Sequence, residues 1–357
     1  MARRKPILGG CLAGSLAGCL AGCLAGSLAG CLAGSLAGCC VLGGMACAAT
    51  AEPLEPPPVF VREFAPRGTS PGELQGARGI SAGPDGTLFI ADSFADRLEM
   101  FDSTGVYLGG WGTTGSGPGQ LRYPLDVECD ASGAVYVVDH DNYRVQKFTA
   151  GGTYVLEWGR EGIAAGEFLG PWGIGIGPDG SVYVSDQPTG RIERFTANGV
   201  FLNQWGSPGL GPGEFSSPIG ITVDAAGNVF VTDGNARYVQ KFTPTGELLA
   251  RWGGGGTAPG FFYTPFGIAC DPQQNVFVVD HHNFRIQKFT NDGGFITMWG
   301  SKGTAPGQFA SSHGMTIDSQ GRIYILDFGN EGFVQCYAYP RVSVRPVSFG
   351  DVKALFR

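Results

Sequence analysis

The segment PLDVECDASGAVYVVDHDNYRVQKFTAGGTYVLEWG (residues 124–159) contains four short apolar runs, at residues 126–129, 134–139, 144–148 and 154–158. The turn sequences ASG and AGG separate two pairs of these runs, and their glycines suit the positive φ angles of tight hairpins. Runs such as VYVV are apolar on both faces, which is typical of a sheet packed between two other sheets. The segment therefore predicts a four-stranded antiparallel meander.

This unit is repeated along the chain with a constant period of 47 residues. Five tryptophans keep the interval: Trp111, Trp158, Trp205, Trp252 and Trp299. Six aspartates keep it as well: Asp92, Asp139, Asp186, Asp233, Asp280 and Asp327. Four-stranded sheets repeated radially form a β-propeller, with the first strand of each blade nearest the axis. The repeats predict an all-β, six-bladed propeller.

An isolated strand-like fragment, VFVREF at residues 59–64, precedes the first complete repeat. Phe64 lies 47 residues before Trp111, so the fragment has the phase of a fourth strand. At the other end, residues 307–337 supply three strands, and the next tryptophan phase falls on Pro346, which suits a strand interior poorly. We therefore expect the N-terminal strand to close the last blade, giving a propeller over residues 59–340.

The repeat resembles the NHL repeat, on segments such as PWGIGIGPDGSVYVSDQPTGRIERF (residues 171–195) and PFGIACDPQQNVFVVDHHNFRIQKF (residues 265–289). The resemblance covers nearly all of residues 59–340 and implies the propeller fold. It does not select a function. Similar propellers serve as interaction platforms, as sensor domains of bacterial membrane kinases and as a zinc-dependent amidating lyase that cleaves peptidyl-hydroxyglycine.

The leader, residues 1–50, begins with a basic segment and continues in a four-residue pattern of Leu-Ala-Gly-Cys and Leu-Ala-Gly-Ser. This pattern is typical of a secretion signal, and Leu-Ala-Gly-Cys resembles the lipobox of bacterial lipoproteins. The usual length of the apolar core favours Cys19 or Cys23 as the lipidated residue. An uncleaved membrane segment is the alternative. Either arrangement predicts an exported protein held at the bacterial cell envelope, at the outer membrane or facing the periplasm.

A proline-rich linker, residues 51–58, follows the leader, and a tail, residues 341–357, follows the propeller. The three basic residues at positions 3–5 leave 21 basic against 31 acidic residues in the remainder. Nucleic-acid binding requires cations that displace counterions from phosphate, so the acidic balance argues against a nucleic-acid partner. The cysteines beyond the leader, Cys129, Cys270 and Cys336, are expected to be small buried apolar groups without disulfides.

The repeated aspartates follow the second strand of each blade and precede an arginine by five residues in four repeats. We expect them to cap turn amides and pair with that arginine rather than form a metal ring. The loop between strands two and three and the start of strand one should open on one face of the propeller. His140, His281 and His282 lie in such loops, and His313 starts a first strand.

One position at the start of each first strand should surround the mouth of the central channel. We call these the mouth residues: Arg78, Leu125, Trp172, Ile219, Phe266 and His313. They predict a polar arc at Arg78 and His313, next to His281 and His282, and an apolar arc opposite. This combination suits an amphipathic ligand or a peptide terminus. The alternative is that these residues bind no ligand and only fill the channel or lie in solvated loops, which would give the same pattern.

Two classes of function follow. The favoured one is a non-catalytic, envelope-tethered platform that binds a protein, peptide or glycan through Arg78, His140, Trp172, Phe266, His281, His282 and His313, without a cofactor. The alternative is a metal-dependent lyase or hydrolase that holds zinc through His140, His281 and His313, since three histidines with an open position form a catalytic zinc site. The sequence offers no nucleophile with an adjacent base and no phosphate-binding loop.

Overall fold

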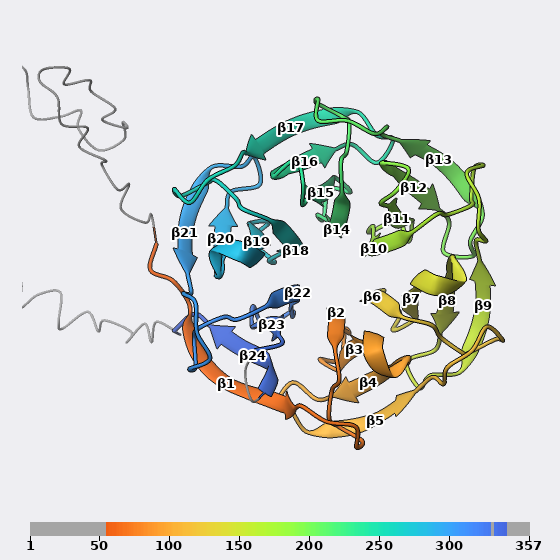
Figure 1. Cartoon of the computed structure of the whole chain (residues 1–357), viewed down its shortest axis with the longest axis horizontal. Helices are drawn as coiled ribbons and strands as arrows, with labels where there is room; N and C mark the ends of the chain where they lie inside the picture. The colour runs from red at the N-terminus through yellow and green to blue at the C-terminus, as the bar shows by residue number, and fades with distance from the viewer. Residues whose placement is uncertain (1–54, 330–331, 341–357) are drawn as a thin grey trace, which may run out of the picture. The chain divides into compact units, whose positions relative to one another are not determined.

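Short runs rich in valine, isoleucine and aromatic residues form the strands of the protein, because branched and aromatic side chains fit a pleated, buried surface. The computed structural model describes residues 55–329 and 332–340. These residues form six four-stranded antiparallel sheets arranged as a closed ring (Figure 1). The predicted six-bladed, all-β propeller is therefore confirmed, with the four strands of each sheet running outward from the axis.

The strands keep nearly constant lengths from blade to blade. Blades one and two consist of β2 (Ala77–Ala82), β3 (Leu88–Asp92), β4 (Arg97–Phe101), β5 (Tyr107–Trp111), β6 (Pro124–Cys129), β7 (Val135–Asp139), β8 (Arg144–Phe148) and β9 (Tyr154–Trp158). Blades three and four consist of β10 (Pro171–Ile176), β11 (Val182–Asp186), β12 (Arg191–Phe195), β13 (Phe201–Trp205), β14 (Pro218–Val223), β15 (Val229–Asp233), β16 (Tyr238–Phe242) and β17 (Leu248–Gly253). Blades five and six consist of β18 (Pro265–Cys270), β19 (Val276–Asp280), β20 (Arg285–Phe289), β21 (Phe295–Trp299), β22 (Ser312–Ile317), β23 (Ile323–Asp327), β24 (Gly332–Ala338) and β1 (Val59–Pro66). Three short 3-10 helices follow second strands: η1 (Ser93–Ala95), η2 (His140–Asn142) and η3 (His281–Asn283).

The N-terminal strand closes the ring, as its phase in the repeat predicted. β1 pairs antiparallel with β24, from Val59 opposite Ala338 to Pro66 opposite Gly332. The sixth sheet therefore has the order β1-β24-β23-β22, and Figure 1 shows β1 as its outer strand. Two segments from opposite ends of the propeller sequence complete one blade by backbone hydrogen bonds.

Aromatic residues of the outer strands pack across the seams between blades. Trp111 of blade one lies 5.8 Å, ring to ring, from Phe148 of blade two. A Cβ atom at the turn residue Gly152 would lie 2.6 Å from the Trp111 indole, so only glycine fits there. Phe64 of β1 takes the place of the tryptophan in blade six, against Gly105 and 5.6 Å from the ring of Phe101.

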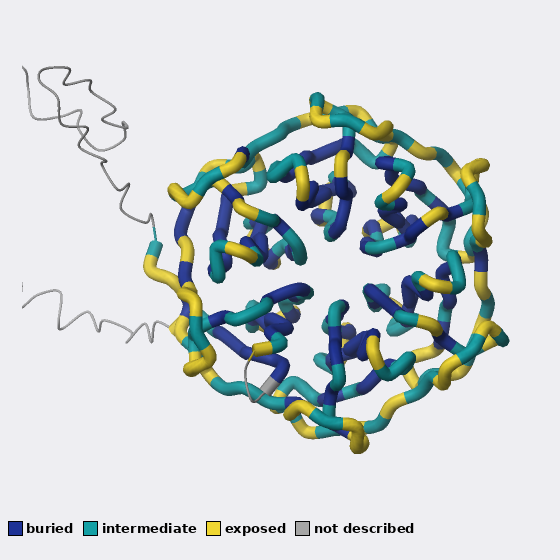
Figure 2. The backbone as a smooth tube through the Cα atoms, viewed as in Figure 1, coloured by how far each residue is buried: buried dark blue, intermediate teal, exposed yellow. Residues whose placement is uncertain are grey.

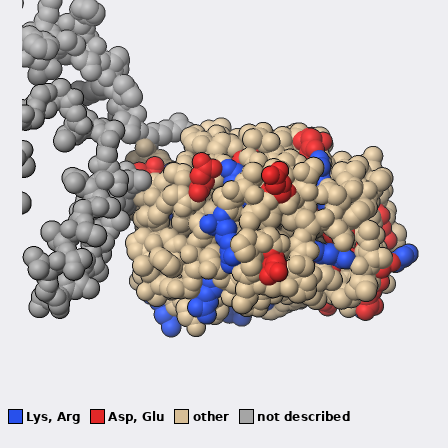
Figure 3. All heavy atoms as spheres, turned by 90° about the horizontal axis from the view of Figure 1, so that it is seen from above, with Lys and Arg blue, Asp and Glu red and all other residues tan. Residues whose placement is uncertain are grey.

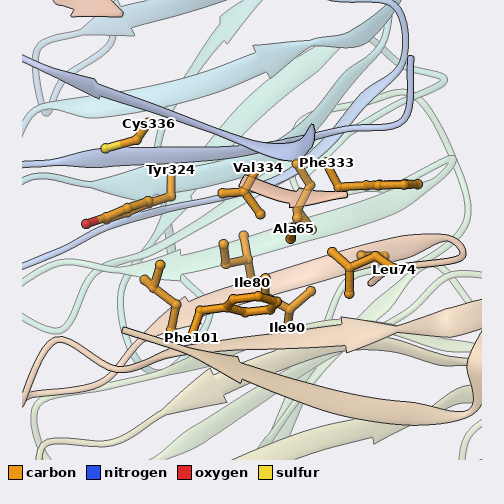
Figure 4. Packing of buried hydrophobic residues seen from close by; sticks show 12 residues of the cluster. Ala65, Leu74, Ile80, Ile90, Phe101, Tyr324, Phe333, Val334 and Cys336 are labelled. Carbon is orange, nitrogen blue, oxygen red and sulfur yellow. The ribbon is translucent and has the colours of Figure 1, made fainter. Parts of the chain in front are cut away.

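Six separate clusters of buried apolar side chains therefore form the core, in place of one central core. Figure 2 shows the buried residues concentrated on the inner strands, with exposed residues on the outer strands and loops. Figure 4 shows the cluster at the closing seam, where Ala65, Val334 and Tyr324 of blade six meet Ile80 and Phe101 of blade one.

The repeated aspartates hold the loops of each blade in place. The distances from the carboxylate to the arginine five residues later are 3.5 Å for Asp92 and Arg97, 2.7 Å for Asp139 and Arg144, 3.7 Å for Asp186 and Arg191, and 2.9 Å for Asp280 and Arg285. Asp139 also accepts hydrogen bonds from the Arg122 amide, Asn142 and Gln146. The expected structural role is confirmed at these four positions.

Several sequence predictions fall outside the described residues: the leader with Cys19 and Cys23, and the tail from residue 341. Among the residues that are described, no helix is long and apolar enough to cross a membrane. Glu55, in the predicted linker, accepts a hydrogen bond of 2.9 Å from Tyr339 and pairs with Lys288. Cys129, Cys270 and Cys336 are free, as expected, but only Cys336 is buried. Cys129 and Cys270 pack against two of the apolar clusters but are only half-buried, so the prediction of burial was wrong for them.

Candidate functional site

The six mouth residues come together around one cavity at the start of the inner strands. Arg78, Leu125, Trp172, Ile219, Phe266 and His313 all line it, together with Asp126 and three glycines. Its volume is about 40 Å³, close to the space that one or two water molecules occupy in the liquid. The cavity therefore has room for a small end group of a ligand, while a larger ligand would lie over the mouth.

The mouth is narrow because the inner strands approach one another closely. The residue after each mouth residue is glycine in five blades: Gly79, Gly173, Gly220, Gly267 and Gly314. A Cβ atom at any of them would lie 2.0–2.6 Å from a backbone atom of the next inner strand. In blade two this position is Asp126, so one carboxyl group enters the ring that is otherwise glycine.

Among the residues that the structure describes, Arg78 has no anionic partner. Its guanidinium carbon lies 5.7 Å from the ring centre of Tyr123, 5.9 Å from that of Phe94 and 5.9 Å from that of Phe328. These distances are within the range of cation–π attraction. The Nε atom is buried without a hydrogen-bond acceptor, and Arg78 forms no ion pair within the described part of the chain. The rings lie around the guanidinium group, and no described residue accepts a hydrogen bond from its N–H groups.

His313 lies beside Arg78 in the polar arc. Its ring is 4.5 Å from Phe328, 5.1 Å from Phe266 and 4.9 Å from His281. Burial, with the positive charges of His281 and Arg78, lowers the pKa of His313 to about 3. Its Nδ1 is 3.0 Å from the Ser311 carbonyl oxygen, which can only accept, so Nδ1 carries the proton and Nε2 the lone pair. His313 therefore offers a neutral hydrogen-bond acceptor.

His281 and His140 connect neighbouring blades. Nδ1 of His281 donates to the Ser312 carbonyl at 2.7 Å, and Nδ1 of His140 donates to the Pro171 carbonyl at 2.8 Å. Each bond joins a loop of one blade to the first residue of the next inner strand. Burial lowers the pKa of His281 as well. Both histidines have a structural role in addition to any contact with a ligand.

The structure brings the predicted histidines together only in part. His281, His282 and His313 form one group, with His281 and His282 4.5 Å apart ring to ring. His140 belongs to a different group and lies against Tyr123 and Trp172, with both ring centres at 6.0 Å. Over residues 55–329 and 332–340, no three His, Cys, Asp or Glu side chains are arranged to hold a metal ion. Only two of the three proposed zinc ligands, His281 and His313, are neighbours.

Two carboxyl groups that we did not single out in the sequence lie in the channel. Asp126 lines the mouth cavity, and Glu128 follows on the same face of β6, two residues further in. Asp126 accepts a hydrogen bond of 3.0 Å from the Ile174 amide across the seam to blade three. Burial raises the pKa of Asp126 to about 7. Burial, with the charge of Asp126, raises the pKa of Glu128 to about 8.

These raised pKa values predict that the propeller loses stability as the pH rises. Between the ordinary carboxyl pKa near 4 and about 8, the folded protein binds more protons than the unfolded chain, so the free energy of unfolding falls with rising pH. The Asp126→Asn, Glu128→Gln double variant should lose roughly 3–6 °C less in Tm than the parent protein between pH 5 and pH 9. Thermal unfolding followed by circular dichroism measures this difference. Asp141→Asn, at an exposed position, is the control, and equal slopes for all three proteins would contradict the prediction.

A second cavity, of about 450 Å³, lies at the other end of the inner strands. It is lined by the turns of blades five and six, including Asp271, Gln273, Gln320 and Arg322, and by Tyr339. It is larger than the mouth cavity. Its charged groups are already paired, however, since Arg322 lies 2.6 Å from Asp318 and Lys288 3.9 Å from Asp271. The mouth is therefore the better candidate for recognition of a charged ligand.

The comparisons with known proteins support the propeller and give no single family for the whole chain. Residues 120–260 match the SMP-30/gluconolactonase/LRE-like region. Residues 269–338 match a family described as a six-bladed β-propeller. No curated protein matches the sequence. The NHL assignment stays a prediction.

Solved structures share the fold at low sequence identity. A streptogramin B lyase superposes with a TM-score of 0.57 and 17% identity over 78% of this chain and 97% of that one. A gluconolactonase from Xanthomonas campestris gives 0.57 and 14% over 81% and 97%. A catalytically inactive His-to-Ala variant of virginiamycin B lyase from Staphylococcus aureus, with quinupristin, gives 0.51 and 17% over 80% and 89%. At these identities the likeness shows the fold alone, because one propeller fold supports many unrelated functions.

Proposed function

We propose that this propeller is a non-catalytic binding platform that accepts the end group of a protein, peptide or glycan at the channel mouth. The observation that carries the proposal is the small cavity bounded by two chemically different arcs. Arg78, which has no ion pair among the described residues, and the polar His313 lie on one side, and the apolar Leu125, Trp172, Ile219 and Phe266 lie on the other. Enclosed sites for small molecules usually measure 300–1,000 Å³. A mouth of about 40 Å³ suits an end group whose remaining atoms stay on the face.

Residues around the mouth extend this surface. Phe94 is 56% exposed and Tyr263 is 48% exposed, although both have large aromatic side chains. Phe94 stacks on Tyr123 beside Arg78, and Tyr263 packs on His282 in blade five. Exposed aromatic residues next to a polar group are typical of surfaces that bind other molecules. The tether to the cell envelope is a further part of the proposal, supported by the pattern of the leader alone.

Affinity capture with mouth variants tests the proposed function. The protein would be immobilised in parental form, as Trp172→Ala and as Leu210→Ala, and exposed to extracts of its source cells. Leu210 is 63% exposed and is not among the residues that line the mouth cavity, so it serves as the matched control. We expect at least one protein or glycan that the parent and Leu210→Ala retain and Trp172→Ala loses by tenfold or more. Identical retention by all three proteins would contradict binding at the mouth.

A further inference from the structure

We propose that the mouth recognises the carboxyl terminus of a peptide, with Arg78 binding the terminal carboxylate. This inference rests on the proposed binding function and narrows its ligand. Three observations carry it: an unpaired arginine held by three rings, a neutral histidine acceptor beside it, and an apolar arc across the cavity.

The site positions Arg78 as a cation that can bind an anionic group of a ligand. Phe94 from η1, Tyr123 before β6 and Phe328 after β23 surround its guanidinium group within 6 Å. The buried arginines of the propeller, Arg144, Arg191 and Arg285, all contact carboxylates. Figure 3 shows acidic and basic side chains interspersed on the side of the ring. An arginine held flat by aromatic rings retains the planar fork that binds a carboxylate through two parallel hydrogen bonds.

The surroundings favour a carboxylate over a phosphate. Arg78 is the one cationic side chain among the described residues that line the cavity, and Asp126 lines it too. A phosphate dianion would need a second positive group, and an ionised Asp126 would repel its double charge more strongly than the single charge of a carboxylate. The volume of about 40 Å³ fits one planar carboxylate group. A single negative charge on a small planar group therefore fits the cavity best.

The neighbouring histidine identifies the second group of the ligand. Nδ1 of His313 is used in its bond to Ser311, and within the described residues Nε2 has no hydrogen-bond partner. A neutral imidazole Nε2 accepts a hydrogen bond and cannot donate one to a carboxylate. The amide N–H of a C-terminal residue lies one carbon from its carboxylate. A peptide end therefore supplies an acceptor group for Arg78 and a donor group for His313.

The apolar arc completes the match with the last side chain of a peptide. Leu125 and Ile219 are buried, whereas Trp172 and Phe266 are half-buried and keep exposed ring surface at the mouth. Contact with an apolar side chain would remove that surface from water, which stabilises a complex. An apolar C-terminal residue is therefore favoured over a charged one.

Titration calorimetry with matched small probes tests the inference. The probes are N-acetyl-L-phenylalanine, its C-terminal amide, 3-phenylpropionate, which lacks the amide N–H, and inorganic phosphate. The proteins are the parent, Arg78→Gln and Arg78→Lys, each checked for an unchanged Tm. We expect N-acetyl-L-phenylalanine to bind the parent at least tenfold more tightly than its amide. Arg78→Gln should weaken binding of the acid by about 10- to 100-fold and leave binding of the amide unchanged, because a charge-assisted hydrogen bond to the carboxylate is lost. The affinity of Arg78→Lys for the acid should lie between those of the parent protein and Arg78→Gln.

Each contrary result has a defined meaning. Equal binding of acid and amide, equal binding of the acid to the parent and Arg78→Gln, or no acid binding at millimolar concentration would overturn the inference. If 3-phenylpropionate binds more tightly than N-acetyl-L-phenylalanine, the ligand is a small carboxylate and not a peptide end. If phosphate binds more tightly than N-acetyl-L-phenylalanine, the ligand is a phosphate and not a carboxylate. If Arg78→Gln retains the partner that Trp172→Ala loses, the carboxylate inference fails and the binding function stands. If Trp172→Ala loses no partner, the proposed function itself fails.

Discussion

Replacing Phe64 with alanine is expected to lower the free energy of unfolding by about 2–4 kcal/mol, somewhat less than for a fully buried phenylalanine because Phe64 is half-buried. Phe64 lies on β1 and packs between Phe101 of blade one and Tyr324 of blade six, with ring centres at 5.6 Å and 6.4 Å. Among the strands that the structure describes, β1 alone is brought to its blade from the opposite end of the propeller sequence. Its loss should therefore weaken closure of the ring as well as one seam.

Urea unfolding followed by tryptophan fluorescence measures this effect, and limited proteolysis within residues 59–66 reports local opening of β1. Val61→Ala is the matched control, because Val61 lies on the same strand and is 45% exposed. We expect Phe64→Ala to be cleaved earlier and to unfold at lower urea concentration than Val61→Ala. Equal midpoints for the two variants would show that β1 contributes little to the closed ring.

Replacing Asp139 with alanine should have a still larger effect, a loss of about 3–5 kcal/mol, because it removes the buried one of the two carboxylates that contact Arg144 and leaves buried donors without an acceptor. Asp139 is fully buried and accepts four hydrogen bonds, from the Arg122 amide, Asn142, Arg144 and Gln146. In the variant these donors would lose their shared acceptor inside blade two. The cost exceeds that of a cavity because unpaired buried polar groups are expensive.

Thermal and urea unfolding of Asp139→Ala and Asp139→Asn against Asp141→Ala test this account of the repeated aspartates. Asp141 lies two residues away and is exposed, so its removal should change the free energy of unfolding by less than about 0.5 kcal/mol. Asp139→Asn should fall between the other two, because the amide keeps one acceptor oxygen and loses the charge. A loss below 1 kcal/mol for Asp139→Ala would contradict a structural role and reopen a functional one.

The period of 47 residues made most of the fold predictable. The position of each residue within the repeat was enough to predict that Phe64 lies on the closing strand and that six residues from six blades surround one mouth, as the structure shows. A closed ring converts sequence phase into position in space, so residues almost 50 positions apart could be compared directly. The contacts of each side chain were harder to predict, because they involve residues at other positions of the 47-residue repeat.

The site shows where that limit lies. Phe94, Tyr123 and Phe328 have three different phases in three parts of the chain, and only the structure shows that they meet at Arg78. Asp126 and Glu128 were missed although a signal existed. Asp126 occupies a position that is glycine in the other five repeats, and that break in the pattern could have drawn attention to the channel. His140 and His281 attracted attention as candidate ligands, and the structure gives them blade-to-blade hydrogen bonds as well.

The central claim is that the channel mouth is where this protein binds its ligand, and the six tryptophans of the chain offer a direct measurement. Five of them lie on outer strands or their seams, and Trp172 alone lines the mouth. The fluorine NMR spectrum of protein labelled with 5-fluorotryptophan should be recorded during titration with N-acetyl-L-phenylalanine and with a captured partner. We expect the Trp172 resonance, assigned from Trp172→Phe, to shift while the other five stay in place. A stationary Trp172 resonance, with binding established by calorimetry or by a shift elsewhere, would contradict the claim.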